Sequence, residues 1–213
     1  MAFRYLSPAG EEGYPGTVQV EVIYTLTDDN TLVIEYRAES DEPTLLNMTN
    51  HSYWNLGGEN VRGHELKLLA DHILESDEVL IPTGQLLSVS GTPYDFRMPK
   101  PLGQDLDTVG GYDNAFVLSD KRRTSAVLAG EVFESVSGRR MTVLTTEPAI
   151  QLYTGNFLDG VAGKNGHRYD RFGAVCLEAQ AHPDAVHHDN FPDIVLRPHR
   201  PYYQQTIHKF SVS

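Results

Sequence analysis

The sequence of 213 residues predicts an all-β domain, an antiparallel sandwich or barrel whose loops carry the functional residues. Three observations support this class. Apolar and polar residues alternate with a period of two along much of the chain. Clusters of Gly, Pro, Asp and Asn separate the alternating runs. No segment of helical length carries an apolar stripe at a spacing of 3.6 residues.

The first strand signals form a hairpin. Residues 17–26 and 31–37 each place every second, apolar residue on one face, and Asp28-Asp29-Asn30 between them is typical of a turn. Residues 137–140, SGRR, predict a second hairpin turn. Further strand-like runs lie at 43–49, 65–69, 115–118, 125–129, 131–136, 140–147, 149–154, 173–179, 193–197 and 203–212.

Two long loops separate these runs. One spans roughly 82–114 and is rich in Pro and Gly, and the other spans 155–172. Loops of such length are unusual unless they serve a function. No repeat, low-complexity tract or block of charge marks a boundary, so we expect a single domain over residues 1–213.

Composition narrows the classes of partner. Seventeen Lys and Arg against twenty-nine Asp and Glu give a formal net charge of −12, which disfavours nucleic acid and anionic membrane surfaces. No apolar run is long enough to span a bilayer, and the first residues lack a secretory signal. Cys176 is the only cysteine, which indicates a reducing compartment. We therefore expect a cytoplasmic protein that acts on a small molecule.

Residues 47–58, NMTNHSYWNLGG, combine a histidine with amides and aromatic rings. Amides such as Asn50 suit ring hydroxyls, and the rings of Tyr53 and Trp54 suit the apolar face of a sugar. A histidine side chain ordinarily exchanges protons near neutral pH, so a residue of this type at position 51 could give a proton to a ring oxygen or take one back. The alternative is a strand end where these residues satisfy backbone groups locally, which is their commoner use.

Three further residues could contact a ligand. Glu178 ends an apolar run, where partial burial would raise its pKa and make it a better base; the alternative is an acid paired with an arginine. Asp113 follows a double glycine, where it could accept hydrogen bonds from vicinal hydroxyls or cap a turn. Gln151 would face the same way as Tyr153 on a strand, toward a sugar or toward solvent.

A histidine-rich segment invites a metal hypothesis. His182, His187 and His188 lie near Asp184 and Asp189, but their spacing matches no closed zinc pattern. A solvated loop is the preferred interpretation, and we expect no metal and no cofactor.

Together these segments resemble the aldose 1-epimerase family, also called the galactose mutarotase family. The matching stretches occur in the family's order and cover nearly the whole chain: SPAGEEGYPG at 7–16, NMTNHSYWNLGG at 47–58, IPTG at 81–84, TPYDFR at 92–97, GYDNAF at 111–116, YTGNFLDG at 153–160 and CLEAQAHPDA at 176–185. The resemblance implies a β-supersandwich of the galactose mutarotase type, with the sugar in a cleft on one sheet.

The resemblance also implies roles for single residues. His51 corresponds to the acid that protonates the ring oxygen, and Glu178 to the base that takes the proton of the anomeric hydroxyl. Asp113 and Gln151 correspond to substrate ligands, and Trp54 stands where the family commonly has Phe. The implied activity is interconversion of the α and β anomers of hexoses such as glucose and galactose.

The resemblance covers only the C-terminal two-thirds of the family pattern. The family's arginine-bearing and histidine-bearing segments, which precede the equivalent of residues 7–16, have no counterpart here. We therefore expect an N-terminally truncated sandwich with exposed apolar surface and open strand edges. Self-association or association with the missing N-terminal segment, together with reduced activity, follows as an expectation.

Two other functions are compatible with the residues. A non-catalytic carbohydrate-binding fragment would keep Asp113, Gln151 and the aromatic rings without turnover. A glycoside hydrolase would use Asp113 and Glu178 as paired carboxylates. The net charge disfavours a third candidate, an epimerase of hexose 6-phosphates.

Overall fold

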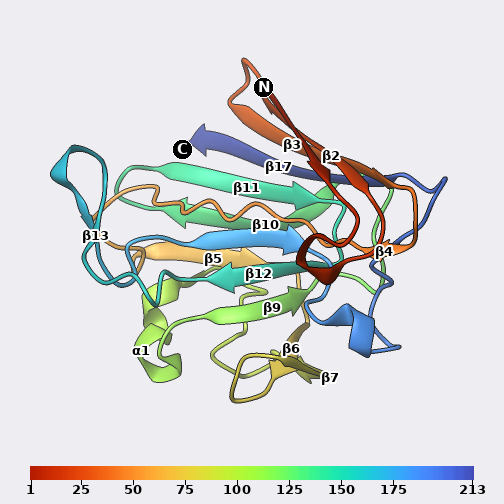
Figure 1. The fold of residues 1–213 in the computed structure, drawn as a ribbon. Coiled ribbons are helices and arrows are strands. Elements are labelled where there is room, and N and C mark those ends of the chain that lie inside the picture. The colour runs from red at the N-terminus through yellow and green to blue at the C-terminus, as the bar shows by residue number, and fades with distance from the viewer.

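The computed structural model describes all 213 residues, which form a sandwich of two antiparallel sheets (Figure 1). The larger sheet has eight strands in the order β1-β2-β3-β17-β11-β10-β5-β8. Their bounds are β1 Ala2–Ser7, β2 Val18–Leu26, β3 Thr31–Ser40, β5 His64–Leu68, β8 Lys100–Pro101, β10 Val127–Glu134, β11 Arg139–Thr145 and β17 Tyr202–Val212. The predicted all-β class is confirmed.

The smaller sheet has five strands in the order β15-β12-β9-β6-β7. These are β6 His72–Ser76, β7 Pro82–Ser88, β9 Asp113–Val117, β12 Ala149–Tyr153 and β15 Cys176–Gln180. Two-residue strands make two further pairs, β4 Thr44–Leu45 with β16 Val195–Leu196, and β13 Val161–Ala162 with β14 Arg168–Tyr169. The helical elements are α1 Leu106–Val109 and 3-10 turns at Glu11–Gly13, Leu102–Gln104, Lys164–Gly166 and Ala185–His187. No helix is long and apolar enough to cross a membrane.

Both predicted hairpins are confirmed. β2 pairs with β3 from Val18 opposite Ser40 to Leu26 opposite Leu32, and β10 pairs with β11 across the turn that contains Gly138. The predicted runs 125–129 and 131–136 are one strand, β10, with a register shift before Gly130. A Cβ atom at Gly130 would lie 2.5 Å from the backbone oxygen of Lys67, so the bulge requires glycine there.

The predicted loop over 82–114 is wrong in part. It opens with β7 and contains β8 and α1, and the side chains of Leu102 and Leu106 are fully buried. β1 and β6 were not predicted either. The sequence of β1, AFRYLS, lacks a clear alternation because this edge strand buries neither face deeply.

The main core lies between the smaller sheet and the β11-β10-β5 part of the larger sheet. Both sheets contribute one face of alternating side chains to it. Its fully buried members include Leu66, Leu68, Val132, Met141, Val143, Phe116, Ile150 and Leu152. Because one face of β9 and β12 is used for this core, every second side chain of those strands points outward.

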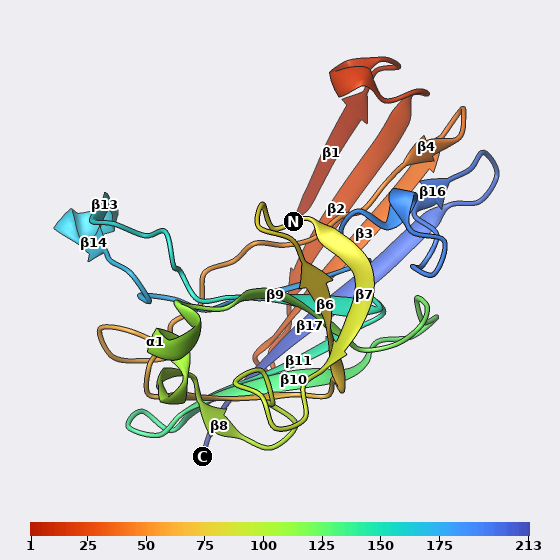
Figure 2. The same cartoon turned by 90° about the horizontal axis from the view of Figure 1, so that it is seen from below.

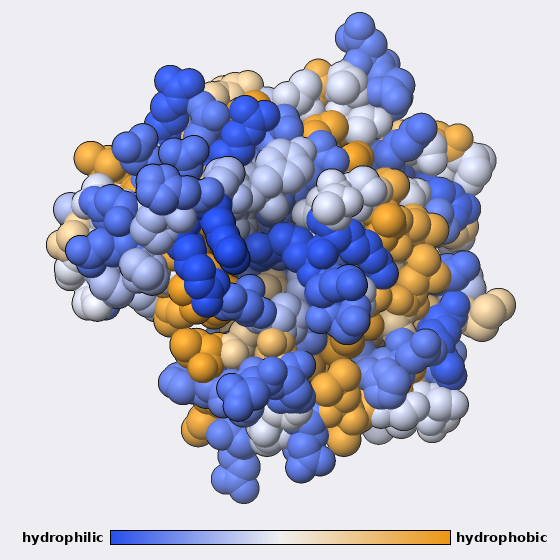
Figure 3. Space-filling view, turned by 90° about the vertical axis from the view of Figure 1, so that its right-hand side faces the viewer, coloured by the Kyte–Doolittle hydropathy of each residue, from blue (hydrophilic) through white to orange (hydrophobic).

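Strands β1, β2 and β3 form a wing that projects beyond the two packed layers (Figure 2). Its inner face carries a smaller core of Val18, Ile34, Tyr36, Ala38, Leu196 and Tyr202. The outermost strand leaves large side chains open, with exposed fractions of 56% for Phe3 and 58% for Tyr5. Hydrophobic residues also reach the surface on the side shown in Figure 3, around a central hollow of hydrophilic residues. Because Phe3 and Tyr5 are more than half exposed, the outer part of the wing lacks the covering layer that protects the main core.

Candidate active site

Three neighbouring strands bring polar side chains to the outer face of the smaller sheet. Glu178 on β15 lies opposite Gln151 on β12, and Gln151 lies opposite Ala115 on β9. Residues directly opposite each other in antiparallel strands share a face, and residues two apart on a strand do so too. Asp113, two residues before Ala115, therefore joins the same face, away from the core.

His51 reaches this face from residues 46–63, the connection between β4 and β5. Its Nε2 atom lies 3.3 Å from Oε1 of Glu178. The side chain of Glu178 is only 9% exposed, whereas that of His51 is 48% exposed. The carboxylate is therefore on the floor of the site and the imidazole is at its rim.

Asp113 and Gln151 form a second polar pair. Nε2 of Gln151 donates a hydrogen bond of 2.7 Å to Oδ1 of Asp113. Oδ2 of Asp113 and Oε1 of Gln151 have no protein partner, so both can accept hydrogen bonds from a ligand.

These four residues line one cavity of about 290 Å³, which lies at the small end of the range for small-molecule sites. The remaining lining residues are Ser76, Leu80, Pro82, Ala115, Gln180 and Pro183. Sequence reasoning missed all six of these. Gln180 and Ala115 had a usable signal, because each lies two residues after a predicted site residue, Glu178 or Asp113, on the same strand face. The others depend on sheet pairing and loop packing that the local sequence does not encode.

Burial raises the pKa of the Glu178 carboxyl above its ordinary value. The charge of His51 opposes this shift and the neighbouring carboxylate of Asp113 reinforces it. A carboxylate with a raised pKa is a stronger base. The site therefore places a nearly buried carboxyl group beside an accessible imidazole.

Aromatic side chains flank the pair. The ring of Tyr53 stacks on that of His51, and Tyr153 meets both rings edge-on, at centroid distances of 5.9 Å from His51 and 6.1 Å from Tyr53. Tyr53 is 49% exposed, which leaves part of its ring open beside the cavity. Tyr53 does not line the cavity but stacks on His51, which does, and its contact with a ligand stays a prediction.

Trp54 does not face the cavity, contrary to the prediction that its ring contacts a sugar. Its indole packs against His208 and Phe210, with centroids 5.4 Å and 5.3 Å away, and contributes to the main core. The reason is the extended backbone: Trp54 bridges Val175, and successive side chains on such a segment point to opposite sides. Because Tyr53 points outward, Trp54 points inward.

Asn50 is also engaged within the protein. Its Nδ2 donates to the hydroxyl of Tyr24 at 3.0 Å, and its Oδ1 accepts from the backbone N–H of Ser52 at 3.2 Å. The histidine-rich segment lies beside the site: His187 and His188 contact Asp184, and the ring of His182 packs on Phe191. Local satisfaction, the alternative weighed for such residues, describes Asn50 well.

The fold and the site define a β-sandwich protein with a histidine–carboxylate pair on the outer face of one sheet. A sequence model of the family described as aldose 1-epimerase matches residues 1–209, and the chain belongs to that family.

Named relatives and solved structures agree with this assignment. The chain is 46% identical to galactose mutarotase of Bos taurus over 217 residues and 40% identical to aldose 1-epimerase of Escherichia coli K12 over 218 residues. These matches cover 99% and 98% of this chain, and 63% of each relative. The chain thus spans less than two-thirds of the length of these relatives.

Two crystal structures share the fold at appreciable identity. A GalM/aldose epimerase homologue from C. elegans superposes with a TM-score of 0.90 at 36% identity, covering 99% of this chain and 65% of that one. Galactose 1-epimerase from Lactobacillus acidophilus superposes with a TM-score of 0.85 at 28% identity, covering 100% and 62%. The predicted sandwich of the galactose mutarotase type is confirmed.

Proposed function

We propose that this protein interconverts the α and β anomers of hexoses such as glucose and galactose. The observation that supports this most directly is the 3.3 Å approach of His51 Nε2 to Glu178 Oε1 in a cavity that also holds Asp113 and Gln151. The names of the relatives, galactose mutarotase and aldose 1-epimerase, point to the same reaction.

The reaction needs two proton transfers at one anomeric centre. With C1 and O5 of a sugar placed against the two side chains, Glu178 takes the proton of the C1 hydroxyl while protonated His51 gives a proton to the ring oxygen O5. The C1–O5 bond breaks and leaves an open-chain aldehyde. Rotation about the C1–C2 bond presents the other face of the carbonyl. The O5 hydroxyl then attacks that face, neutral His51 takes the O5 proton back, and protonated Glu178 gives its proton to the C1 oxygen.

Asp113 and Gln151 supply the orientation. Oδ2 of Asp113 accepts a hydrogen bond from one sugar hydroxyl, and Oε1 of Gln151 accepts from another. Holding the ring in this way keeps C1 near Glu178 and O5 near His51. Because His51 is 48% exposed, water reaches the imidazole, and turnover is expected to be slower than in a fully enclosed site.

A mutarotation assay tests the proposal. Fresh α-glucose or α-galactose is added, and formation of the β anomer is followed with a coupled dehydrogenase. Glu178→Gln is expected to lower kcat by about 100-fold or more, because the amide cannot accept the proton. Glu65→Gln, on a strand of the larger sheet, is the matched control and retains the wild-type rate.

The same assay separates the rival functions. Sugar binding by the wild-type chain without any turnover would establish a carbohydrate-binding protein instead. Release of reducing sugar from a glycoside would establish a hydrolase. Either result overturns the proposed isomerase activity.

We also propose that the wing is an interface between two copies of the chain. Strand β1 is an open edge of the larger sheet, and Phe3, Tyr5 and Leu6 on it are each more than half exposed. An apolar open edge of this kind favours pairing with another strand. Analytical ultracentrifugation should show a concentration-dependent dimer. A stable monomer contradicts the proposal, and a complex only with an added polypeptide equivalent to the part of the relatives that this chain does not match would assign the wing to that partner.

A cytoplasmic location is the third part of the proposal. Cys176 is unpaired and buried, and the folded chain depends on no disulfide. Cell fractionation with an antibody to the chain tests this, and recovery from the secreted fraction contradicts it.

A further inference from the structure

The strand that carries Glu178 has a free edge. β15 is the outermost strand of the smaller sheet and pairs only with β12. An edge strand presents unpaired N–H and C=O groups along its open side. Residues 47–54, which contain His51, run along this open side of β15 and so bring His51 next to Glu178.

Backbone hydrogen bonds join the two segments at one end only. Trp54 and Val175 form an antiparallel bridge, with N–O distances of 2.9 Å and 2.8 Å. From Asn47 to Tyr53, the backbone makes no hydrogen bond to the backbone of β15. The position of His51 relative to Glu178 therefore depends on other contacts.

Side chains supply those contacts in the register of a strand. Asn47 uses both ends of its amide on the backbone of Ala181: Oδ1 accepts from its N–H at 2.9 Å and Nδ2 donates to its C=O at 3.0 Å. Two residues further along, Oγ1 of Thr49 donates to the C=O of Ala179 at 3.0 Å. From the first contact to the second, the residue number rises by two on the segment 47–53 and falls by two on the partner segment, which is the pattern of an antiparallel ladder.

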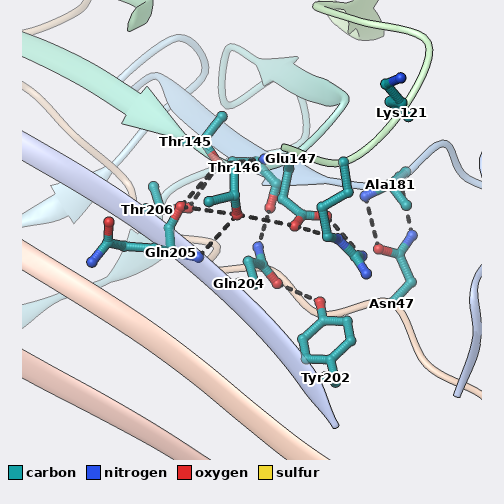
Figure 4. Close-up of polar contacts among 12 residues, drawn as sticks. Asn47, Lys121, Thr145, Thr146, Glu147, Ala181, Tyr202, Gln204, Gln205 and Thr206 are labelled. Carbon is teal, nitrogen blue, oxygen red and sulfur yellow. Dashed lines mark hydrogen bonds and ion pairs between the residues drawn. The ribbon is translucent and has the colours of Figure 1, made fainter. Parts of the chain in front are cut away.

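A strand of the larger sheet also binds the backbone C=O of Ala179. Nε2 of Gln204 on β17 donates to the C=O of Ala179 at 2.9 Å, and the hydroxyl of Tyr202 donates to Oε1 of Gln204 at 2.6 Å. Figure 4 shows the amide of Asn47 aligned with the backbone of Ala181, and Gln204 extended from β17 with Tyr202 below it. Ala179, the residue directly after Glu178, is thus held by two side chains, so its backbone is a fixed reference for Glu178.

We propose that Asn47 and Thr49 are positioning residues that set the separation between His51 Nε2 and Glu178 Oε1. Their side chains replace the missing backbone hydrogen bonds between residues 47–53 and β15, and hold the imidazole over the carboxylate. The catalytic consequence rests on the proposed mutarotase activity, whereas the structural consequence does not.

The first test uses activity. Thr49→Val removes the hydroxyl at nearly constant shape, and it is expected to lower kcat by about 10- to 100-fold while KM changes less than about threefold, because misplacement affects proton transfer more than binding. Thr49→Ser restores the donor and recovers most of kcat. Thr92→Val is the matched control: it removes a hydroxyl that donates to the C=O of Val89 and accepts from the N–H of Tyr94, in a loop outside the site, and it leaves kcat unchanged. Equal kcat in Thr49→Val and wild type overturns the proposal.

The second test reads the geometry without turnover. The ring ¹⁵N signals of His51 are recorded by NMR, and Glu178→Gln is expected to shift them because the two side chains are in contact. When Thr49→Val and Asn47→Ala are both present, that shift falls to less than half. An undiminished shift in the folded double variant, checked by circular dichroism, overturns the positioning role. A wild-type chain without turnover refutes only the proposed function, and the NMR result still decides this inference.

Discussion

The ring of Tyr53 stacks on the ring of His51, with centroids 5.0 Å apart and planes inclined by 19°. His51 is half exposed, and its ring is held at the rim by this stack and by the edge of Tyr153. The orientation of the His51 imidazole therefore depends on a neighbour that is itself at the surface.

Replacing Tyr53 tests the value of this stack. Tyr53→Ala is expected to lower kcat by about tenfold, because the imidazole gains alternative rotamers. Tyr53→Phe keeps the stacked ring and the rate. The thermal midpoint of both variants stays close to wild type, since Tyr53 is 49% exposed. A large fall in Tm for Tyr53→Ala, with kcat unchanged, would show that the ring serves stability alone.

The pH dependence of turnover follows from Glu178. Its carboxyl must be ionised to act as a base, and burial raises its pKa. The rate kcat/KM is therefore expected to fall on the acid side at a higher pH than the ordinary value of 4.5 for a glutamate. Asp113 raises this pKa further. Asp113→Asn should thus move the acid limb to lower pH while raising KM, and pH–rate profiles of both proteins measure it. If the acid limb of the profile does not move in Asp113→Asn, Asp113 is not a cause of the raised pKa of Glu178.

Arg122 and Glu147 form a buried ion pair with two hydrogen bonds, of 2.7 Å and 2.9 Å. The side chain of Glu147 is fully buried, and that of Arg122 is 28% exposed. Arg122→Met leaves the carboxylate without its partner and is expected to cost about 3 kcal/mol of the free energy of unfolding. Adding Glu147→Gln recovers part of the loss. Urea unfolding of the single and double variants gives the coupling, and additive effects would contradict a direct pair.

Buried neutral histidines make stability depend on pH. Burial lowers the pKa of both His182 and His208 to about 4, and neither ring nitrogen of His208 has a hydrogen-bond partner. Between pH 6.5 and about 4 the unfolded chain binds more protons than the folded chain, so the free energy of unfolding decreases as the pH falls. Each group contributes a slope of up to about 1.4 kcal/mol per pH unit.

The contribution of His208 can be isolated. His208→Phe keeps a flat ring against Trp54 and removes the titrating group, so the slope between pH 6 and pH 4.5 should become shallower. Urea midpoints measured at several pH values check this. An unchanged slope would mean that other groups account for the acid sensitivity.

Most strands were predictable because a half-buried sheet imposes a period of two on the sequence. β2, β3, β11 and β17 follow that period and lie where it placed them. β1 escaped prediction because it is an edge strand with both faces open, and β7 because its Pro and Gly are typical of loops. The alternation of apolar and polar residues arises because one face of a strand is buried, so strands with little burial are hard to predict from the sequence.

The site was predictable to a different extent. His51, Glu178, Asp113 and Gln151 were singled out from the sequence, and the structure brings them together in one cavity. Trp54 was misassigned because composition does not reveal which side of an extended segment a ring occupies. The hydrogen bonds of Asn47 and Thr49 could not be predicted from the sequence, since they join residues more than 100 positions apart.

The attachment of residues 47–53 to β15 has a consequence for how the sequence can vary. A rung made of backbone groups accepts almost any amino acid other than proline. A rung made by a side chain accepts only residues that offer the right donor at the right reach. At positions 47 and 49, the attachment to β15 therefore depends on the identity of two side chains, whereas in a regular sheet it depends on the backbone alone. Substitutions at these positions would leave the sheets intact while the side chains of His51 and Glu178 lose their alignment.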